Sequence, residues 1–238
     1  MSLEADLAAR LDRVRGRIAR AAKASGRDPS DVLLVAVSKT YPASHVRAAY
    51  AAGQRDFGEN RVQEALPKIE ATSDLPVRWH LVGHLQSNKV RKAATSFPVV
   101  HSIDSAPLLE ALDRAALAAG VRPEVLVQVD LAGEATKFGV PPENLGQVLE
   151  AARSCRAARP AGLMLMPPFF EDAEAARPYF RRLRALRDEL LASGRLPASA
   201  VHLSMGMSHD LEPAVEEGAT IVRVGTAIFG PRGLTSNA

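Results

Sequence analysis

The chain of 238 residues is 47% hydrophobic and 24% charged, which fits one α/β barrel of about 250 residues or two smaller domains. Its 30 basic and 27 acidic residues give a net charge of +3 without a long run of one sign, and 5% of residues are aromatic, which argues against nucleic-acid binding. No apolar run reaches the roughly 18 residues of a membrane span, and the single cysteine, Cys155, excludes an internal disulfide and favours a reducing, cytoplasmic location.

Segment 1–26 is predicted to form one amphipathic helix that packs on the rest of the chain. Its apolar residues recur at steps of three and four, the spacing of one helical face, at Leu3, Leu7, Leu11, Val14 and Ile18. Glu4, Asp6 and Asp12 lie among the arginines of this segment. Because transit peptides avoid acidic residues, we interpret the segment as a structural helix.

From residue 32 onward, short apolar strands alternate with helical stretches. The predicted strands are 32–38, 55–57, 78–82, 99–103, 124–130, 161–164, 200–204 and 220–224. The predicted helical stretches are 44–52, 61–70, 88–94, 106–119, 142–156, 172–191 and 211–217. Each connection is long enough to hold a helix, so we expect the strands to run parallel.

Eight strand–helix units can close into a barrel or open into a doubly wound sheet. The chain contains neither the G-x-G-x-x-G pattern of dinucleotide-binding sheets nor a P-loop, and the eightfold count favours closure. No linker or change of composition divides the sequence. We therefore predict an α/β fold, a (β/α)8 TIM barrel in a single domain over residues 1–238, with the additional helix at its N-terminus.

Lysine is scarce in this sequence, and one lysine follows the first predicted strand, at the barrel end where functional groups of such folds lie. This residue, Lys39, can lose its proton near neutrality if it is partly desolvated, and then attack a carbonyl. The alternative is a strand-end lysine that reaches water. Lys137, in a loop after the fifth strand, contacts either phosphate or solvent. The other lysines fall on helical stretches whose solvated faces explain them: Lys23, Lys68, Lys89 and Lys92.

Two loops rich in glycine and hydroxyl groups follow the seventh and eighth strands, where such barrels commonly bind phosphate: 204–208 and Gly225-Thr226. Ser208 either adds a donor there or caps the helix that follows. Arg223 lies within an apolar strand, where a guanidinium needs an acid or a ligand acceptor. A carbonyl-reactive lysine, a phosphate cup and an inward arginine together suggest a phosphorylated aldehyde, of which pyridoxal 5′-phosphate is the obvious one.

Seven ordered motifs make the chain resemble a known family over nearly its whole length. They are 35–40 (VAVSKT), 57–64 (FGENRVQE), 79–89 (WHLVGHLQSNK), 137–139 (KFG), 162–164 (GLM), 203–208 (LSMGMS) and 222–230 (VRVGTAIFG). The family is YggS/PROSC, the pyridoxal phosphate homeostasis proteins. Ordered motifs of this length are far more specific than any single pattern.

The resemblance implies a barrel of pyridoxal phosphate fold type III, similar to the N-terminal domain of alanine racemase. It implies that Lys39 holds the cofactor as an internal aldimine and that Arg223 faces the pyridine nitrogen. A cation there leaves the ring neutral, which limits carbanion chemistry but not reversible aldimine formation. It also implies Asn60 on the cofactor's flank and Ser204, Gly225 and Thr226 around the phosphate. Met205 is expected as a further cofactor-binding residue.

Racemases of this fold take a second acid–base group, a tyrosine, from an additional β-domain, for which 238 residues leave no room. Tyr50 and Tyr179 fall on helical stretches, and Tyr41 is expected to pack in a loop beside Pro42. We therefore expect a carrier that takes part in intracellular pyridoxal phosphate homeostasis and releases the cofactor by transimination, without enzymatic turnover. The alternatives are a small racemase that uses the same lysine, and a Schiff-base aldolase, which does not explain Arg223.

The expected partners are pyridoxal phosphate and the pyridoxal-dependent apo-enzymes that receive it, with no nucleic acid or membrane and a monomeric chain. His80 and His84 are four residues apart but have no third ligand nearby in the sequence, so no metal site is expected. His202 is expected to be a hydrogen-bonded core residue, and Cys155 a small buried hydrophobe.

Overall fold

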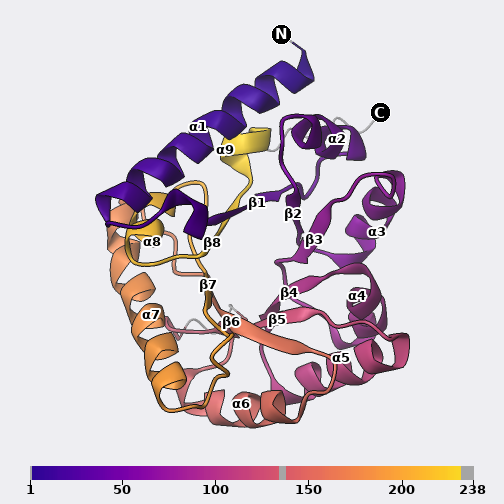
Figure 1. Cartoon of the computed structure of the whole chain (residues 1–238), viewed down its shortest axis with the longest axis vertical. Helices are drawn as coiled ribbons and strands as arrows, with labels where there is room; N and C mark the ends of the chain where they lie inside the picture. Colours follow the sequence, from indigo (N-terminus) through magenta and orange to yellow (C-terminus); the bar gives the residue numbers. More distant parts are fainter. Residues whose placement is uncertain (1, 134–137, 232–238) are drawn as a thin grey trace.

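A closed barrel of eight parallel strands forms the centre of the molecule, with helices around it (Figure 1). The computed structural model describes residues 2–133 and 138–231. β8 pairs with β1 and so closes the ring. The strands follow the chain order around the barrel: β1 (Leu33–Val37), β2 (Asp56–Glu59), β3 (Arg78–Leu81), β4 (Val99–Ile103), β5 (Glu124–Val129), β6 (Arg159–Leu165), β7 (His202–Ser204) and β8 (Ile221–Val224).

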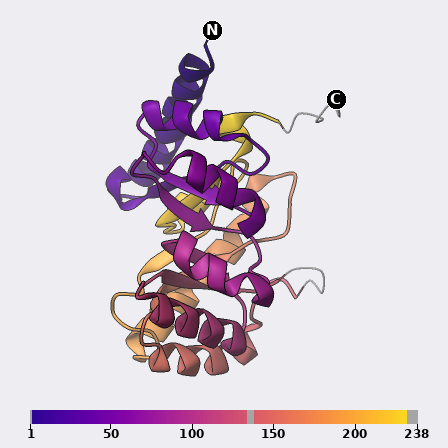
Figure 2. The ribbon, with the colours of Figure 1, turned by 90° about the vertical axis from the view of Figure 1, so that its right-hand side faces the viewer.

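The helices cover the outside of this ring (Figure 1). They are α1 (Leu3–Ala24), α2 (Ala43–Ala51), α3 (Val62–Ala71), α4 (Val90–Ser96), α5 (Ala106–Ala119), α6 (Leu145–Ser154), α7 (Arg177–Ala192), α8 (Leu211–Glu216) and α9 (Thr226–Phe229). Short 3-10 helices precede four elements: η1 (Pro29–Asp31), η2 (Ser87–Lys89), η3 (Pro142–Asn144) and η4 (Ala173–Ala176). Seen from the side in Figure 2, the orange loop after β6 and the yellow segment after β8 extend to the same side of the ring.

The predicted barrel is confirmed, and every predicted strand is present with ends that differ by at most two residues. The helical stretches predicted at 88–94, 142–156 and 172–191 are each divided into a 3-10 turn and an α-helix. The helix α9 was not predicted, because four residues are too few to show a helical period.

Side chains along the strands alternate between the barrel interior and the layer beneath the helices. In β1, Leu34 and Ala36 belong to the main core, whereas Val35 and Val37 belong to a smaller cluster inside the barrel. The other buried members of the interior cluster are Val82, Val99, Leu126, Ala161, Met164 and Ile221. Lys39 follows Val37 by two residues, so the alternation directs it to the interior side at the carboxyl end of β1.

The N-terminal helix α1 packs against α2, α8 and α9. Its start is capped by the Ser2 hydroxyl, which accepts a hydrogen bond from the Ala5 amide at 3.2 Å. Arg17 donates from Nε and Nη2 to the Glu212 carboxylate of α8 at 2.5 and 2.6 Å, and from Nη1 to the Ser208 carbonyl at 3.0 Å. The helix therefore holds the loop after β7, which belongs to the end of the barrel where the candidate site lies.

The predicted apolar face of α1 is buried, apart from its first residue. Leu11 is 0% exposed, whereas Leu3 is 40% exposed. Replacing Leu11 by Ala is expected to lower the free energy of unfolding by about 2–5 kcal/mol, because it leaves a cavity between α1 and the barrel. Urea unfolding followed by circular dichroism measures the effect, with Leu3→Ala as the control in the same helix. Equal losses for the two variants would contradict the packing of α1 described above.

Candidate functional site

A cavity of about 680 Å³ opens at the carboxyl ends of the strands. Five of its lining residues come from β1, β2 and β8 or the turns directly after them: Val37, Lys39, Asn60, Arg223 and Gly225. The rest of the lining is Val82, Gly83, His84, Gln128, Phe138, Met166, Phe169, Met207, Ser208, His209 and Thr226. The cavity thus brings together Lys39, Asn60, Arg223, Gly225 and Thr226, five of the residues selected from the sequence.

Lys39 sits in a tight turn at the end of β1. The Tyr41 amide donates to the Ser38 carbonyl at 3.1 Å, and Thr40 between them has a φ of 69°. Among the described residues Thr40 is the only non-glycine residue with a positive φ. Such a conformation is uncommon for a β-branched residue and is retained where the surroundings determine it. The turn therefore fixes the direction in which the chain leaves β1 immediately after Lys39.

A buried polar cluster anchors this turn from the outer side of the barrel wall. The Ser38 hydroxyl donates to Glu59 Oε1 at 2.6 Å, and Lys68 Nζ of α3 donates to the same oxygen at 2.7 Å and to the Ser38 carbonyl at 2.8 Å. Glu59 is fully buried, and burial raises the pKa of its carboxyl although Lys68 and Ser38 act in the opposite sense.

The assignment of Lys68 to a solvated helix face was wrong. Its side chain is 12% exposed and is paired with Glu59, which is 0% exposed. A helical position next to the barrel wall can look like a surface position in the sequence, because the partner Glu59 lies on another element. Glu59 itself carried no separate signal beyond its place in the 57–64 motif.

Arg223 is buried in the barrel interior, with 5% of its surface exposed at the floor of the cavity. Nη1 donates to the Ser204 hydroxyl at 2.7 Å, and Nη2 donates to the Leu165 carbonyl at 2.9 Å. Burial lowers the pKa of Arg223 to about 10, and Asp210 opposes this effect from a distance. The group is therefore still charged at neutral pH, and its two acceptors are both neutral.

Ser204 and Met205 were expected beside the cofactor, but neither is among the described residues that line the cavity. Both are 0% exposed. The Ser204 hydroxyl lies between Arg223 and His101, and the Met205 amide donates to the Ile221 carbonyl at 3.0 Å. The Ser204 hydroxyl and the Met205 amide thus form hydrogen bonds within the barrel, and contact of either residue with the cofactor stays a prediction.

The loops after β7 and β8 meet at the start of α9. The Ser208 hydroxyl accepts from the Ala227 amide at 3.2 Å, so Ser208 caps α9 and not the helix that follows it in the chain. Thr226 occupies the first position of α9, where the helix itself offers no acceptor for the amide. A Cβ at position 225 would lie 3.3 Å from the Val37 carbonyl, so glycine keeps the β8 end close to β1.

Asn60 is positioned by a close approach of two backbones. A Cβ at position 83 would lie only 2.3 Å from the Asn60 carbonyl oxygen, so only glycine permits this packing. The result is that Asn60, directly after β2, and Gly83, after β3, form adjacent parts of the cavity wall.

The mouth of the cavity is apolar and includes a histidine that the sequence analysis did not select for the site. The His84 ring stacks on Phe138 with centroids 3.7 Å apart, and His84 Nδ1 lies 3.2 Å from Asp104 Oδ2. Phe138 is 54% exposed and Phe169 is 79% exposed, so this rim faces solvent. Its position in a strand-end loop, in the 79–89 motif, was the available signal for His84. Lys137 lies outside the described residues.

The remaining candidates have structural environments. The Tyr41 hydroxyl donates to the Gly230 carbonyl at 2.9 Å, in agreement with a packing role. His202 is half-buried with Nδ1 3.2 Å from the Thr220 hydroxyl, and burial raises the pKa of the half-buried Cys155 to about 11. Within residues 2–133 and 138–231, no group of three or more potential ligands is arranged around a metal position, and no helix has the length and apolarity of a membrane span.

A family model, named relatives and solved structures all indicate the same family for this chain. The model of the family described as alanine racemase, N-terminal domain, matches residues 9–233. A relative from Pseudomonas aeruginosa named pyridoxal phosphate homeostasis protein is 47% identical over 227 residues, which cover 95% of this chain and 96% of the relative. The solved structure of PipY from Synechococcus elongatus with PLP bound is 42% identical, with a TM-score of 0.83 over 94% of this chain and 100% of that one.

A more distant likeness concerns the fold alone. Alanine racemase from Bartonella henselae is 17% identical and aligns with a TM-score of 0.69, over 97% of this chain and 61% of the racemase. The near relatives confirm the resemblance that the seven motifs carry. This chain belongs to the alanine racemase N-terminal domain family and, within it, to the pyridoxal phosphate homeostasis proteins.

Proposed function

We propose that this chain binds pyridoxal 5′-phosphate at the mouth of its barrel and passes it to amines of apo-enzymes, as a carrier in pyridoxal phosphate homeostasis. The observation that carries the proposal is the convergence of Lys39 and Arg223 on one cavity of about 680 Å³. The likeness at 42% identity to PipY, whose structure was solved with PLP bound, supports the choice of ligand. We further propose that the chain acts as a monomer in the cytoplasm, where its single cysteine stays reduced.

The groups around the cavity fit a phosphorylated aldehyde with a pyridine ring. Arg223 has N–H groups beyond the two bonded within the barrel, and it would face the ring nitrogen. Gly225 and Thr226 would hold the phosphate, since the first turn of α9 presents an amide and a hydroxyl without a helical acceptor. Asn60 would lie on the flank of the ring.

Bound pyridoxal phosphate supplies an aldehyde carbon that primary amines attack reversibly. Lys39 provides the amine on the protein side, and the turn anchored by Glu59 keeps it on the interior side of the wall. Arg223, as a cation, disfavours a proton on the ring nitrogen. This arrangement supports exchange of one amine for another and gives little help to carbanion formation.

The alternative function is a small amino-acid racemase at the same site. His84, which lines the cavity beside Asp104, is the observation that favours it, because a histidine backed by a carboxylate can transfer protons. Against a racemase, no tyrosine is among the described lining residues, and the Tyr41 hydroxyl donates a hydrogen bond to the Gly230 carbonyl. The carrier remains the proposed function.

Replacing Lys39 by Ala is expected to abolish covalent attachment of the cofactor. The wild type mixed with pyridoxal phosphate should gain a visible absorption band and, after borohydride reduction, one added mass of cofactor on the peptide that contains residue 39. Lys89→Ala, which removes a lysine from the neighbouring cavity, is the matched control and should behave as the wild type. Equal labelling of Lys39→Ala and the wild type would contradict the assignment of Lys39.

The loaded protein is expected to transfer cofactor to an apo-enzyme faster than it releases cofactor into buffer, because an incoming amine can replace Lys39 directly. Recovery of apo-enzyme activity measures transfer, and an added scavenger of free cofactor measures release. Incubation with single enantiomers of amino acids, followed by chiral chromatography, should show no racemisation. Turnover that His84→Ala removes would favour the racemase instead.

Glu59→Gln is expected to change the pH dependence of stability more than stability itself. Because burial raises the folded-state pKa of Glu59, its contribution to stability is present at low pH and is lost as the pH rises through that pKa. The amide resembles the neutral acid, so the variant should lack this loss. Glu59→Ala should instead cost about 2–4 kcal/mol, since it leaves the Ser38 hydroxyl without its acceptor and Lys68 with the Ser38 carbonyl alone.

Urea unfolding of the three proteins between acidic and neutral pH measures these differences. If wild type and Glu59→Gln show the same change of stability with pH, the buried carboxyl does not titrate as described.

A further inference from the structure

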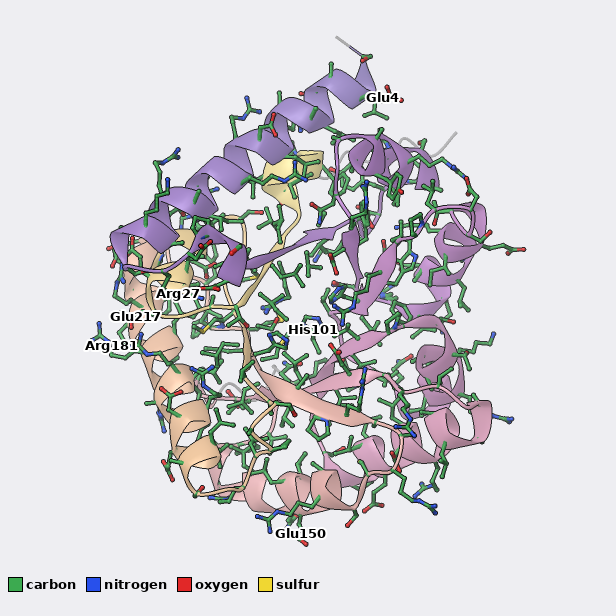
Figure 3. All side chains as sticks on the ribbon, viewed as in Figure 1. Glu4, Arg27, His101, Glu150, Arg181 and Glu217 are labelled. Carbon is green, nitrogen blue, oxygen red and sulfur yellow. The ribbon has the colours of Figure 1, made fainter. Side chains whose placement is uncertain are left out.

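A continuous series of hydrogen-bonded groups crosses the barrel interior from Asp56 to Arg223. Asp56 Oδ1 lies 2.9 Å from His80 Nε2, and His80 Nδ1 lies 3.0 Å from His101 Nε2. His101 Nδ1 lies 2.8 Å from Ser204 Oγ, which accepts from Arg223 Nη1 at 2.7 Å. Figure 3 shows His101 near the middle of the ring of strands.

The two ends of this series lie at opposite ends of the barrel. Asp56 is the first residue of β2, and its side chain is 15% exposed. Arg223 lies near the carboxyl end of β8 and lines the cavity. The three groups between them are fully buried: His80, His101 and Ser204. Water therefore has little access to the series except at its ends.

Burial also keeps the two imidazoles neutral. Burial lowers the pKa of His80, with Asp56 acting in the opposite sense, and burial lowers the pKa of His101 well below its usual value. A neutral imidazole has one N–H donor and one acceptor nitrogen. Each ring can therefore donate in only one direction along the series.

The chemistry of the ends then determines every proton position. A carboxylate only accepts, so His80 carries its proton on Nε2 and accepts at Nδ1 from His101 Nε2. His101 consequently accepts at Nδ1, where the donor is the Ser204 hydroxyl. That hydroxyl in turn accepts from Arg223, which has only donors. In the opposite arrangement, His80 Nε2 would face the carboxylate without a proton.

We propose that this series of hydrogen bonds from Asp56 through His80, His101 and Ser204, here called the relay, positions Arg223. The remaining N–H groups of Arg223 then face the cofactor cavity. Nη2 is held independently by the Leu165 carbonyl at 2.9 Å, so the two contacts together fix the plane of the guanidinium. His80 and His101 act as positioning residues that do not touch the ligand. The statement that Arg223 meets pyridoxal phosphate rests on the proposed function, but the relay itself does not.

Nitrogen-15 NMR of histidine rings in the cofactor-free protein tests the relay directly. We expect both His80 and His101 to be protonated at Nε2 only, with a coupling through the hydrogen bond between His101 Nε2 and His80 Nδ1. A proton on His101 Nδ1, or a doubly protonated ring in either residue at neutral pH, would overturn the proposal.

Asp56→Asn tests whether the relay reaches the cavity, because this substitution lies at the far end of the barrel. We expect a second tautomer of the two rings, a shifted visible band of the bound cofactor and a roughly fivefold higher Kd for pyridoxal phosphate, the size of effect that such networks transmit. Asp31→Asn, an exposed change in η1 at the same barrel end, should alter none of these.

A substitution within the relay separates positioning from simple packing. His101→Gln can still donate and accept along the series and should keep the band of the wild type, whereas His101→Leu should shift it as Asp56→Asn does. His202→Gln is the matched control outside the relay. Should His101→Leu fail to fold, Asp56→Asn still decides the outcome.

The results distinguish the two proposals. If the wild type does not bind pyridoxal phosphate, the proposed function fails, and the ring tautomers alone decide whether the relay exists. If the wild type binds but Asp56→Asn keeps its band and its Kd, Arg223 is positioned without the relay.

Discussion

The charge of Arg223 inside the barrel is the constraint on which the arrangement of the site depends. A guanidinium removed from water needs acceptors, and the interior offers it a serine hydroxyl and a main-chain carbonyl in place of a carboxylate. A direct carboxylate would occupy the donors and neutralise the group. Neutral acceptors hold the cation in place and leave its charge and its remaining donors for the cavity.

The wall of the barrel separates two polar systems that serve different parts of the site. Inside it, the series through His101 ends at Arg223. Outside it, Glu59 and Lys68 hold the end of β1 from beneath α3. Because successive residues of a strand face opposite sides, Ser38 can take part in the outer system while Lys39 next to it faces the cavity. The position of Lys39 thus depends on packing on the outer side of the barrel wall, away from the cavity.

The sequence predicted the barrel well because its signals are local. Eight apolar strands, long crossovers and glycines at helix ends each appear within a few neighbouring residues, and Lys39, Gly225 and Thr226 could be selected from their places at strand ends. Contacts between distant elements left no such signal. The hydrogen bonds of the Ser204 hydroxyl with His101 and Arg223 therefore could not be predicted, and Lys68 was wrongly placed in solvent although it pairs with Glu59.

The two histidines show most clearly why such pairing is invisible in a sequence. His80 and His101 stand 21 residues apart on adjacent strands, so no local pattern in the sequence links them. Their partnership follows from register, since β3 and β4 pair His80 with Val99 and so set His101 one interior position farther along the barrel. A chain of hydrogen-bond donors and acceptors therefore crosses the barrel interior. It connects Asp56 with Arg223 at the cavity, a connection that apolar side chains do not provide.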